Sequence, residues 1–529
     1  MKKINLTTIA FLLIGIFGCQ DQLDVDNPNQ PTPESAKNEQ GIIALAQGSL
    51  YINAFQGLKF GGSYFGQVNN FHERMGDIVA SPFVPGELYC PDSVILDNGS
   101  NLPSINSNGQ VGYLRAINVP SSQNNPLYFE WGLMYSLNNA MNHILATVDE
   151  IEMTEFKKET IKAWAYFWKG FAYSRIGSMY YAAVITNEPG KTNPDYVTKE
   201  EILLEAGLNF AKAETLLSSL SGNSDYEKVI TALIPSVCQT GKGYPLSSNE
   251  WQRNINTMRA RNILVNTSPA SMTSAQWDEI LSLTATGIKQ TDNTFTVRTD
   301  PLGNLLGANG FAAAGAIGPA SRGGGGNKVS ERFIQDFKVG DKRFLNNFNQ
   351  IPAYVGPRDR GSLFNTRYLL IDKGKGMPGV VTLVNRDIGA HELYIAGSYE
   401  ENVLMLAEAN IYKGNIDAGL ALIDKLRTYQ GAGLAAIAGA GLTADQAKEE
   451  LRRERRVGLA FRGFSFYDAR RWGVLKNGRT GSVVVDFNGV VNTNATIQYG
   501  YLDYWDVPIA ELFYNPPAEG SASVVNPKN

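Results

Sequence analysis

The chain has 529 residues, with 47 Lys and Arg against 51 Asp and Glu, so its formal net charge is −4 at pH 7. This weakly acidic balance argues against a nucleic-acid-binding protein, which needs a basic face for phosphates. Only three Cys and three His are present, so a disulfide framework or a Cys/His zinc module is nearly excluded. Apolar residues make up 43% of the chain, which is ordinary for a globular protein with large buried cores.

The N-terminus has the pattern of an export signal. Two lysines precede a short apolar run, Ile9 to Phe17, which is too short to span a bilayer because a membrane helix needs roughly 20 apolar residues. The run IFGC that ends at Cys19 resembles a bacterial lipobox. We therefore predict a lipoprotein signal peptide at residues 1–18, lipidation at Cys19 and a polar tether over residues 19–33. The alternative is a plain secretory signal, but no A-x-A-like cleavage site is visible.

Helical periodicity then recurs in pairs of segments. It predicts helical pairs at about 34–54, 127–183, 198–290 and 392–473, the first of them starting at Thr32-Pro33. Capping boxes at Thr198/Glu201 and Thr273/Gln276 mark two further helix starts. The turn at residues 409–415 resembles the helix-turn-helix joint of a tetratricopeptide repeat. Together these features predict a mainly α protein with a degenerate helical-repeat body.

Three regions lack this periodicity and are rich in Gly, Asn, Ser and Pro. They cover about 55–126, 291–390 and 474–529, and we expect them to form one loop-rich lobe. Loops of this length are usually functional. Cys90 and Cys238 could form a disulfide outside the cytoplasm, and the sequence leaves open whether they meet.

Motifs for catalysis are missing from the sequence. No G-x-S-x-G elbow, H-E-x-x-H helix or Walker loop occurs. The G-x-G-x-x-A run at 431–436 follows a predicted helix rather than a strand, so we interpret it as a helix–helix loop. The three His have no metal-ligand spacing, and we predict no metal, no cofactor and no catalytic residue. A carboxylate pair of the glycosidase type stays open, because Asp and Glu are plentiful and nothing singles out a pair.

A basic cluster runs from Arg452 to Arg471 and is interleaved with acidic residues. It could face phosphate, but the opposing carboxylates lie within helical reach. We therefore predict an ion-paired structural helix end.

Aromatic residues among Asn, Asp and Gln offer the most promising chemistry. Sugar rings stack on exposed aromatic faces, and amides or carboxylates bind their hydroxyls, although such aromatics can equally pin loops to the body. From their loop context we name five candidate ligand-binding residues: Phe83, Tyr89, Asp92, Asn98 and Tyr113.

Several segments together resemble the SusD/RagB family of outer-membrane nutrient-binding lipoproteins. The strongest is residues 451–473 (LRRERRVGLAFRGFSFYDARRWG), where Gly458 and Arg462 stand at positions that commonly hold Glu in the family. Weaker similarities lie at residues 164–180, 330–343, 399–427 and 507–516.

This resemblance implies a SusD-like fold over residues 34–529, with a tetratricopeptide-like helical body and a ligand-binding lobe. It further implies non-catalytic capture of an oligomeric nutrient, with a glycan favoured over a peptide. The implied partner is a SusC-like TonB-dependent outer-membrane β-barrel. The expected location is the outer membrane, lipid-anchored and facing the cell exterior. A secreted hydrolase is the alternative of a different class.

Overall fold

The structure is a computed structural model. It describes residues 37–56, 68–80, 93–102, 109–120, 125–298, 328–354, 365–371, 392–486 and 488–528. The predicted signal peptide, Cys19, the tether and Cys90 lie outside the described residues, so these predictions stay untested. Cys238 is buried.

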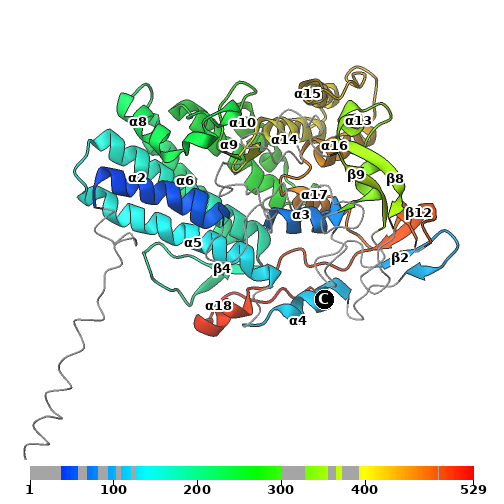
Figure 1. Cartoon of the computed structure of the whole chain (residues 1–529), viewed down its shortest axis with the longest axis horizontal. Coiled ribbons are helices and arrows are strands. Elements are labelled where there is room, and N and C mark those ends of the chain that lie inside the picture. Colours follow the sequence, from blue (N-terminus) through cyan, green and yellow to red (C-terminus); the bar gives the residue numbers. More distant parts are fainter. Residues whose placement is uncertain are drawn as a thin grey trace, which may run out of the picture.

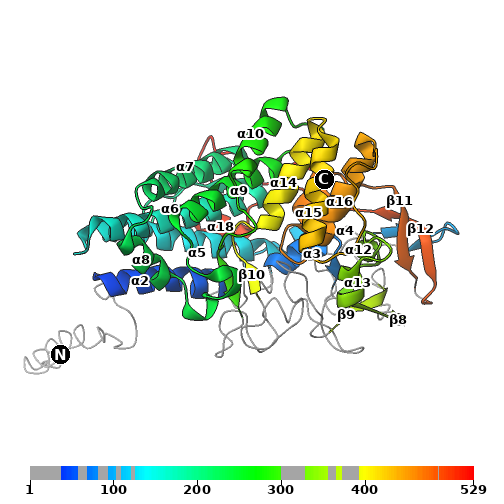
Figure 2. The same ribbon diagram turned by 90° about the horizontal axis from the view of Figure 1, so that it is seen from above.

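The helical body is a curved stack of antiparallel helices on one side of the molecule (Figures 1 and 2). Its first part contains α2 (Glu39–Gly48), continued by the π-helical η2 (Ser49–Gln56), then α5 (Pro126–Thr147), α6 (Glu155–Met179), α7 (Lys199–Ser218), α8 (Ser224–Leu233), α9 (Ser248–Asn266) and α10 (Ser274–Ala285). Short 3-10 turns η5 (Val148–Glu150), η6 (Ser236–Cys238) and η7 (Gly241–Gly243) connect some of them.

Helix α6 is the central element of this stack because its apolar residues cover more than one face. Trp164, Phe167 and Trp168 are fully buried. Trp168 makes edge-to-face ring contacts with the other two, which in turn contact Trp251 of α9 edge-to-face. The helix packs on α5 on one side and on α7 on the other.

The second part of the body contains α14 (Tyr399–Tyr412), α15 (Ile416–Tyr429), α16 (Ala444–Gly458) and α17 (Ser465–Arg471). Helices α14 and α15 pack closely: a Cβ added at Gly419 would lie 2.5 Å from Cγ1 of Ile411 and 2.8 Å from the carbonyl oxygen of Ala407. Between them Gly414 turns the chain at φ 86°, a backbone conformation that glycine adopts without strain. The predicted repeat-like joint is therefore present, and the chain is mainly α.

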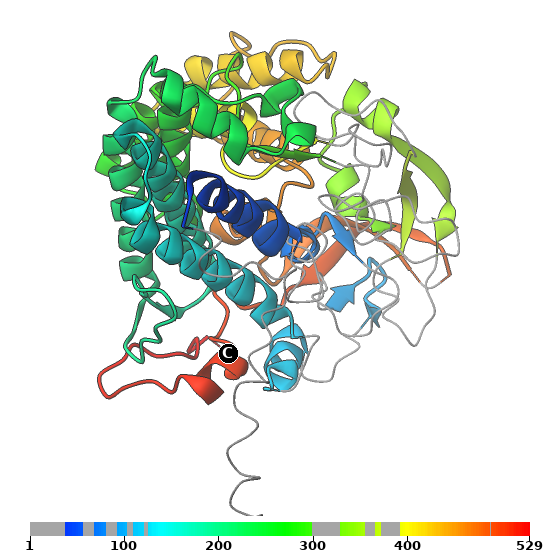
Figure 3. The ribbon, with the colours of Figure 1, turned by 60° about the vertical axis from the view of Figure 1, so that its left-hand side comes forward.

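Strands and short helices form the lobe on the opposite side of the molecule (Figure 3). One antiparallel sheet has four strands in the order β11 (Arg479–Val485), β12 (Val491–Gln498), β2 (Ser93–Ile95) and β3 (Asn101–Leu102). Four antiparallel pairs complete the described strands: β1 (Val79–Ala80) with β7 (Lys328–Val329), β6 (Thr296–Arg298) with β10 (Glu392–Tyr394), β8 (Phe348–Tyr354) with β9 (Thr366–Leu370), and β4 (Ala182–Val184) with β5 (Tyr196–Thr198). The remaining helices are α3 (Asn70–Met75), α4 (Gly109–Ile117), α12 (Glu331–Ile334), α13 (Lys342–Asn347) and α18 (Ile509–Tyr514).

The structure corrects several predicted helix boundaries. The first helix begins at Glu39 rather than at Thr32-Pro33, because the side chain of Asn38 caps it by accepting from the backbone N–H of Gly41. Residues 392–394 form a strand rather than the start of a helix, and helix α14 begins only at Tyr399. Within the described residues, no helix is both long enough and apolar enough to cross a membrane.

Candidate functional site

Two strand pairs hold the ends of the described segments that border the long undescribed segments. Ala80 is paired with Lys328, and Arg298 is paired with Glu392. Arg298 also forms an ion pair of 2.7 Å with the carboxylate of Glu392. Residues 81–92, 299–327 and 372–391 border these positions and lie outside the described residues.

A buried ion pair holds the first of these strand pairs. Asp77, immediately after α3, accepts two hydrogen bonds from the guanidinium of Arg332 on α12, at 2.5 and 2.6 Å. The Ser330 hydroxyl donates to the same carboxylate at 2.9 Å. Arg456 on α16 donates to the backbone oxygens of Gly76 and Asp77 at 2.8 and 3.1 Å. Three segments far apart in the chain are thereby joined at the entrance to β1.

A second buried carboxylate, Glu73 of α3, lies at the junction with α17. It accepts the backbone N–H groups of Phe461 at 3.1 Å and of Gly463 at 2.8 Å. Phe461 has φ 64°, an unusual conformation for a non-glycine residue, and its N–H bond to Glu73 helps to hold it there. Burial raises the pKa of Glu73 to about 7, although the two N–H donors oppose that rise.

His72, beside Glu73, belongs to a buried charge cluster rather than to a reactive site. Its Nε2 lies 3.1 Å from the carboxylate of Glu130, which also accepts from Nε of Arg175 at 2.6 Å. Burial lowers the pKa of His72, while Arg175 and His72 together lower the pKa of Glu130 against its own desolvation. Nε2 of His72 thus has partners, whereas its buried Nδ1 has none among the described residues.

The basic cluster of residues 452–471 is ion-paired, as predicted. Arg471 binds Glu408 of α14 through two hydrogen bonds of 2.5 and 2.7 Å, and Arg455 binds Asp468 at 2.9 Å. Arg456 binds Asp336, which lies 120 residues earlier in the chain. The cluster therefore fastens α14, α16 and α17 together, with several partners that lie outside helical reach.

The predicted ligand-binding residues are only partly within the described structure. Phe83, Tyr89 and Asp92 lie outside the described residues. Asn98 is exposed in the turn between β2 and β3, where its side-chain oxygen accepts from the backbone N–H of Ser100 at 2.9 Å. Tyr113 lies on α4, a separate element. The structure does not bring these five together as a described site, and their role in binding stays a prediction.

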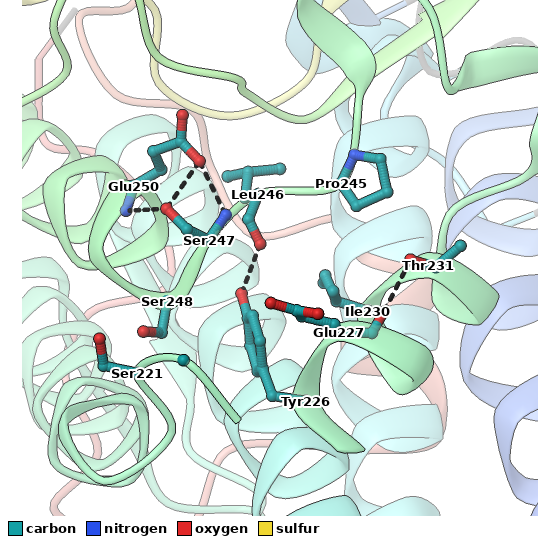
Figure 4. A pocket seen from close by; sticks show the side chains of 11 residues that line it. Ser221, Tyr226, Glu227, Ile230, Thr231, Pro245, Leu246, Ser247, Ser248 and Glu250 are labelled. Carbon is teal, nitrogen blue, oxygen red and sulfur yellow. Dashed lines mark hydrogen bonds between the residues drawn. The ribbon is translucent and has the colours of Figure 1, made fainter. Parts of the chain in front are cut away.

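A surface pocket of about 310 Å³ lies on the helical body, between α8 and the start of α9 (Figure 4). It is lined by Ser221, Gly222, Tyr226, Glu227, Ile230, Thr231, Pro245, Leu246, Ser247, Ser248 and Glu250. The predicted helical pair at about 198–290 included no separate helix starts at Ser224 or Ser248, so this pocket was not predicted. A sequence signal for the start of α9 does exist, because Ser247 and Glu250 form a complete capping box that places this start at Ser248.

Among the described residues, no group of three or more His, Cys, Asp and Glu side chains could hold a metal ion.

The described architecture, a helical-repeat body bearing a strand-and-loop lobe, matches solved structures across most of the chain. A SusD superfamily protein from Parabacteroides distasonis aligns with a TM-score of 0.58 and 14% identity, covering 92% of this chain and 98% of that one. Surface glycan-binding protein A from Bacteroides uniformis aligns with a TM-score of 0.55 and 15% identity, covering 90% and 97%. A structure determined with a xylogluco-oligosaccharide aligns with a TM-score of 0.57 and 14% identity, covering 92% and 99%.

These similarities define a helical-repeat protein with the SusD-like fold. In the sequence itself, residues 399–518 match the model of the SusD family, which confirms the resemblance of the C-terminal motifs. The chain therefore has a SusD-like fold, and its C-terminal segment is similar to the SusD family. No curated protein sequence matches it.

Proposed function

We propose that this protein captures an oligomeric glycan at the cell surface without altering it chemically. The observation that supports this proposal most directly is the SusD-like fold together with the SusD family match at residues 399–518. Two of the similar structures are described as a surface glycan-binding protein and as a complex with a xylogluco-oligosaccharide. Binding would occur on the lobe, where Phe83, Tyr89 and Tyr113 supply aromatic faces and Asp92 and Asn98 bind sugar hydroxyls.

The proposal includes a partner and a location. The captured glycan would pass to a SusC-like TonB-dependent β-barrel in the outer membrane, and a lipid on Cys19 would hold the chain beside it. The lipobox-like run that ends at Cys19 supports the anchor. A Cys19→Ser variant should move from the outer-membrane fraction to the soluble fraction. Retention of the variant in the membrane fraction would contradict lipid anchoring at this residue.

An array of immobilised glycans and peptides, probed with the full chain in detergent, tests the ligand class. Capture predicts retention on one family of glycans and no shortening of the glycan that is recovered afterwards. Retention on peptides alone would show that the captured ligand is a peptide and not a glycan. Shortened glycans would show that the protein is a hydrolase.

A further inference from the structure

The pocket between α8 and α9 lies on the helical body. Figures 1 and 2 place α8 near one end of the long axis and strand β12 near the other. Its walls come from the turn between α7 and α8, from one face of α8 and from Pro245 to Glu250 at the start of α9.

The apolar floor of this pocket is held in place by the fold. The Tyr226 hydroxyl donates to the backbone oxygen of Leu246 at 2.7 Å, which fixes α8 against the segment before α9. Tyr226, Ile230 and Leu246 are each 1–2% exposed, so the floor exists before any ligand arrives. Asn223 caps α8 through its side-chain oxygen. A preformed site loses less free energy on binding than one that must be ordered.

One polar group in the pocket wall has no partner. Ser248 is 2% exposed, and its hydroxyl makes no hydrogen bond within the part of the chain that the structure describes. Figure 4 shows Ser248 and Ser221 together on one side of Tyr226. The Ser248 hydroxyl lines the pocket and is free to form a hydrogen bond with a ligand hydroxyl.

The charges around the pocket exclude an anionic ligand. No Lys, Arg or His is among the described residues that line it, whereas Glu227 and Glu250 carry carboxylates. Glu250 already accepts from Ser247 N and Oγ, both at 2.7 Å, and from Asn293 N at 3.0 Å. Glu227 is exposed at the rim, where water and salt screen its attraction for a cation. These conditions favour a neutral ligand with an apolar face and hydroxyl edges.

We propose that this pocket on the helical body is a second binding site for a neutral, hydroxyl-rich ring of the size of one sugar residue. The volume of about 310 Å³ is at the small end of ligand pockets, which begin at about 300 Å³. The ring would lie against Ile230 and Leu246, with its hydroxyls directed to Ser248, Ser221 and Glu227. This inference goes beyond capture by the lobe and does not require it.

The test measures binding of D-glucose, D-galactose and D-xylose to the full chain in detergent by ligand-observed NMR. At least one of them should bind saturably, with a dissociation constant on the order of 1–10 mM. Ser221→Phe fills the mouth of the pocket and should abolish that binding. Ser248→Ala should weaken it roughly 3- to 10-fold, because one hydrogen bond is lost. Ser236 is exposed and does not line the pocket, so Ser236→Phe and Ser236→Ala are the matched controls and should change nothing.

Three results would overturn the second site: no saturable binding of any of the three sugars, full binding to Ser221→Phe, or tighter binding of D-glucosamine than of D-glucose. Thermal unfolding of each variant confirms that it is folded. Binding of a long glycan that persists in Ser221→Phe supports capture by the lobe independently, so failure of the pocket and failure of the proposed function are distinguishable.

Discussion

Arg332 and Asp77 are separated by 255 residues in the chain, yet they form a buried two-point ion pair with hydrogen bonds of 2.5 and 2.6 Å. The pair joins α12 to the end of α3, directly beside the strands β1 and β7. It therefore fixes the point where two long segments of the lobe leave the described structure.

Removing one partner of this ion pair should be costly. Arg332→Ala leaves the carboxylate of Asp77 buried with only hydroxyl donors, and we expect it to lower the free energy of unfolding by about 3–5 kcal/mol. Urea denaturation measures the change. The control is Lys448→Ala, whose ion pair with Asp445 is largely exposed, and it should change stability by less than about 0.5 kcal/mol. A loss below about 1 kcal/mol for Arg332→Ala would show that the pair does not hold the junction.

The close approach of α14 and α15 predicts opposite effects for two similar substitutions. Gly419→Ala places a methyl group 2.5 Å from Ile411 and should destabilise the protein by about 1–3 kcal/mol through overpacking. Gly207→Ala, on α7, meets no atom within 4 Å and should stabilise by about 0.5–1 kcal/mol, because alanine loses less backbone entropy in a helix. The difference between their thermal midpoints tests the repeat-like packing. Equal midpoints would contradict it.

The raised pKa of Glu73 predicts a pH-dependent stability. Its pKa in the folded protein is about 7, above the ordinary value of 4.5, because the carboxyl is buried. The stability that this group contributes is therefore fully present below about pH 4.5 and is lost as the pH rises to about 7. Glu73→Gln cannot ionise, and it also loses one of the two acceptors for the N–H groups of Phe461 and Gly463.

Glu73→Gln should thus have a lower free energy of unfolding than the wild type at about pH 5. This difference in free energy of unfolding should become smaller at about pH 7.5. Urea midpoints of both proteins at the two pH values measure this difference. Because His72 and Glu130 titrate in both proteins, their contributions cancel in the comparison. A gap that widens with rising pH would mean that the two N–H donors dominate and that the pKa is lowered instead.

The predicted aromatic surface on the lobe can be tested by alanine substitution of its tyrosines. Tyr89→Ala and Tyr113→Ala should each weaken binding of the captured glycan by roughly 5- to 30-fold, as expected when an interface loses about 1–2 kcal/mol of ring contact. Phe156→Ala removes a ring that is 43% exposed at the start of α6, and it should leave affinity unchanged. Unchanged affinity in both tyrosine variants would remove these residues from the site.

Local signals in the sequence predicted much of the helical body. The capping boxes at Thr198 and Thr273 placed the starts of α7 and α10 correctly, because each box depends only on residues three apart. The same signal at Ser247 was overlooked, and with it the start of α9 and the pocket. The turn before α15 was likewise recognised from local residues alone.

Contacts over long distances in the chain could not be predicted in the same way. The strand at 392–394 is defined by pairing with residues 296–298, and β2 is defined by pairing with residues 496–498. Neither pairing has a local signature. The arginines of α16 were expected to bind nearby carboxylates, yet Arg456 binds Asp336, because tertiary packing brings α12 against α16. The ligand residues follow from loop context only, and three of the five lie outside the described structure.

The most direct test of capture is a calorimetric titration of the full chain, in detergent, with the glycan that the array selects, followed by chromatography of the recovered glycan. The account predicts saturable binding with one dominant affinity and a recovered glycan of unchanged length. Absence of heat and of saturation with every glycan, or a recovered glycan that has been shortened, would contradict the claim that this protein captures glycans without chemistry.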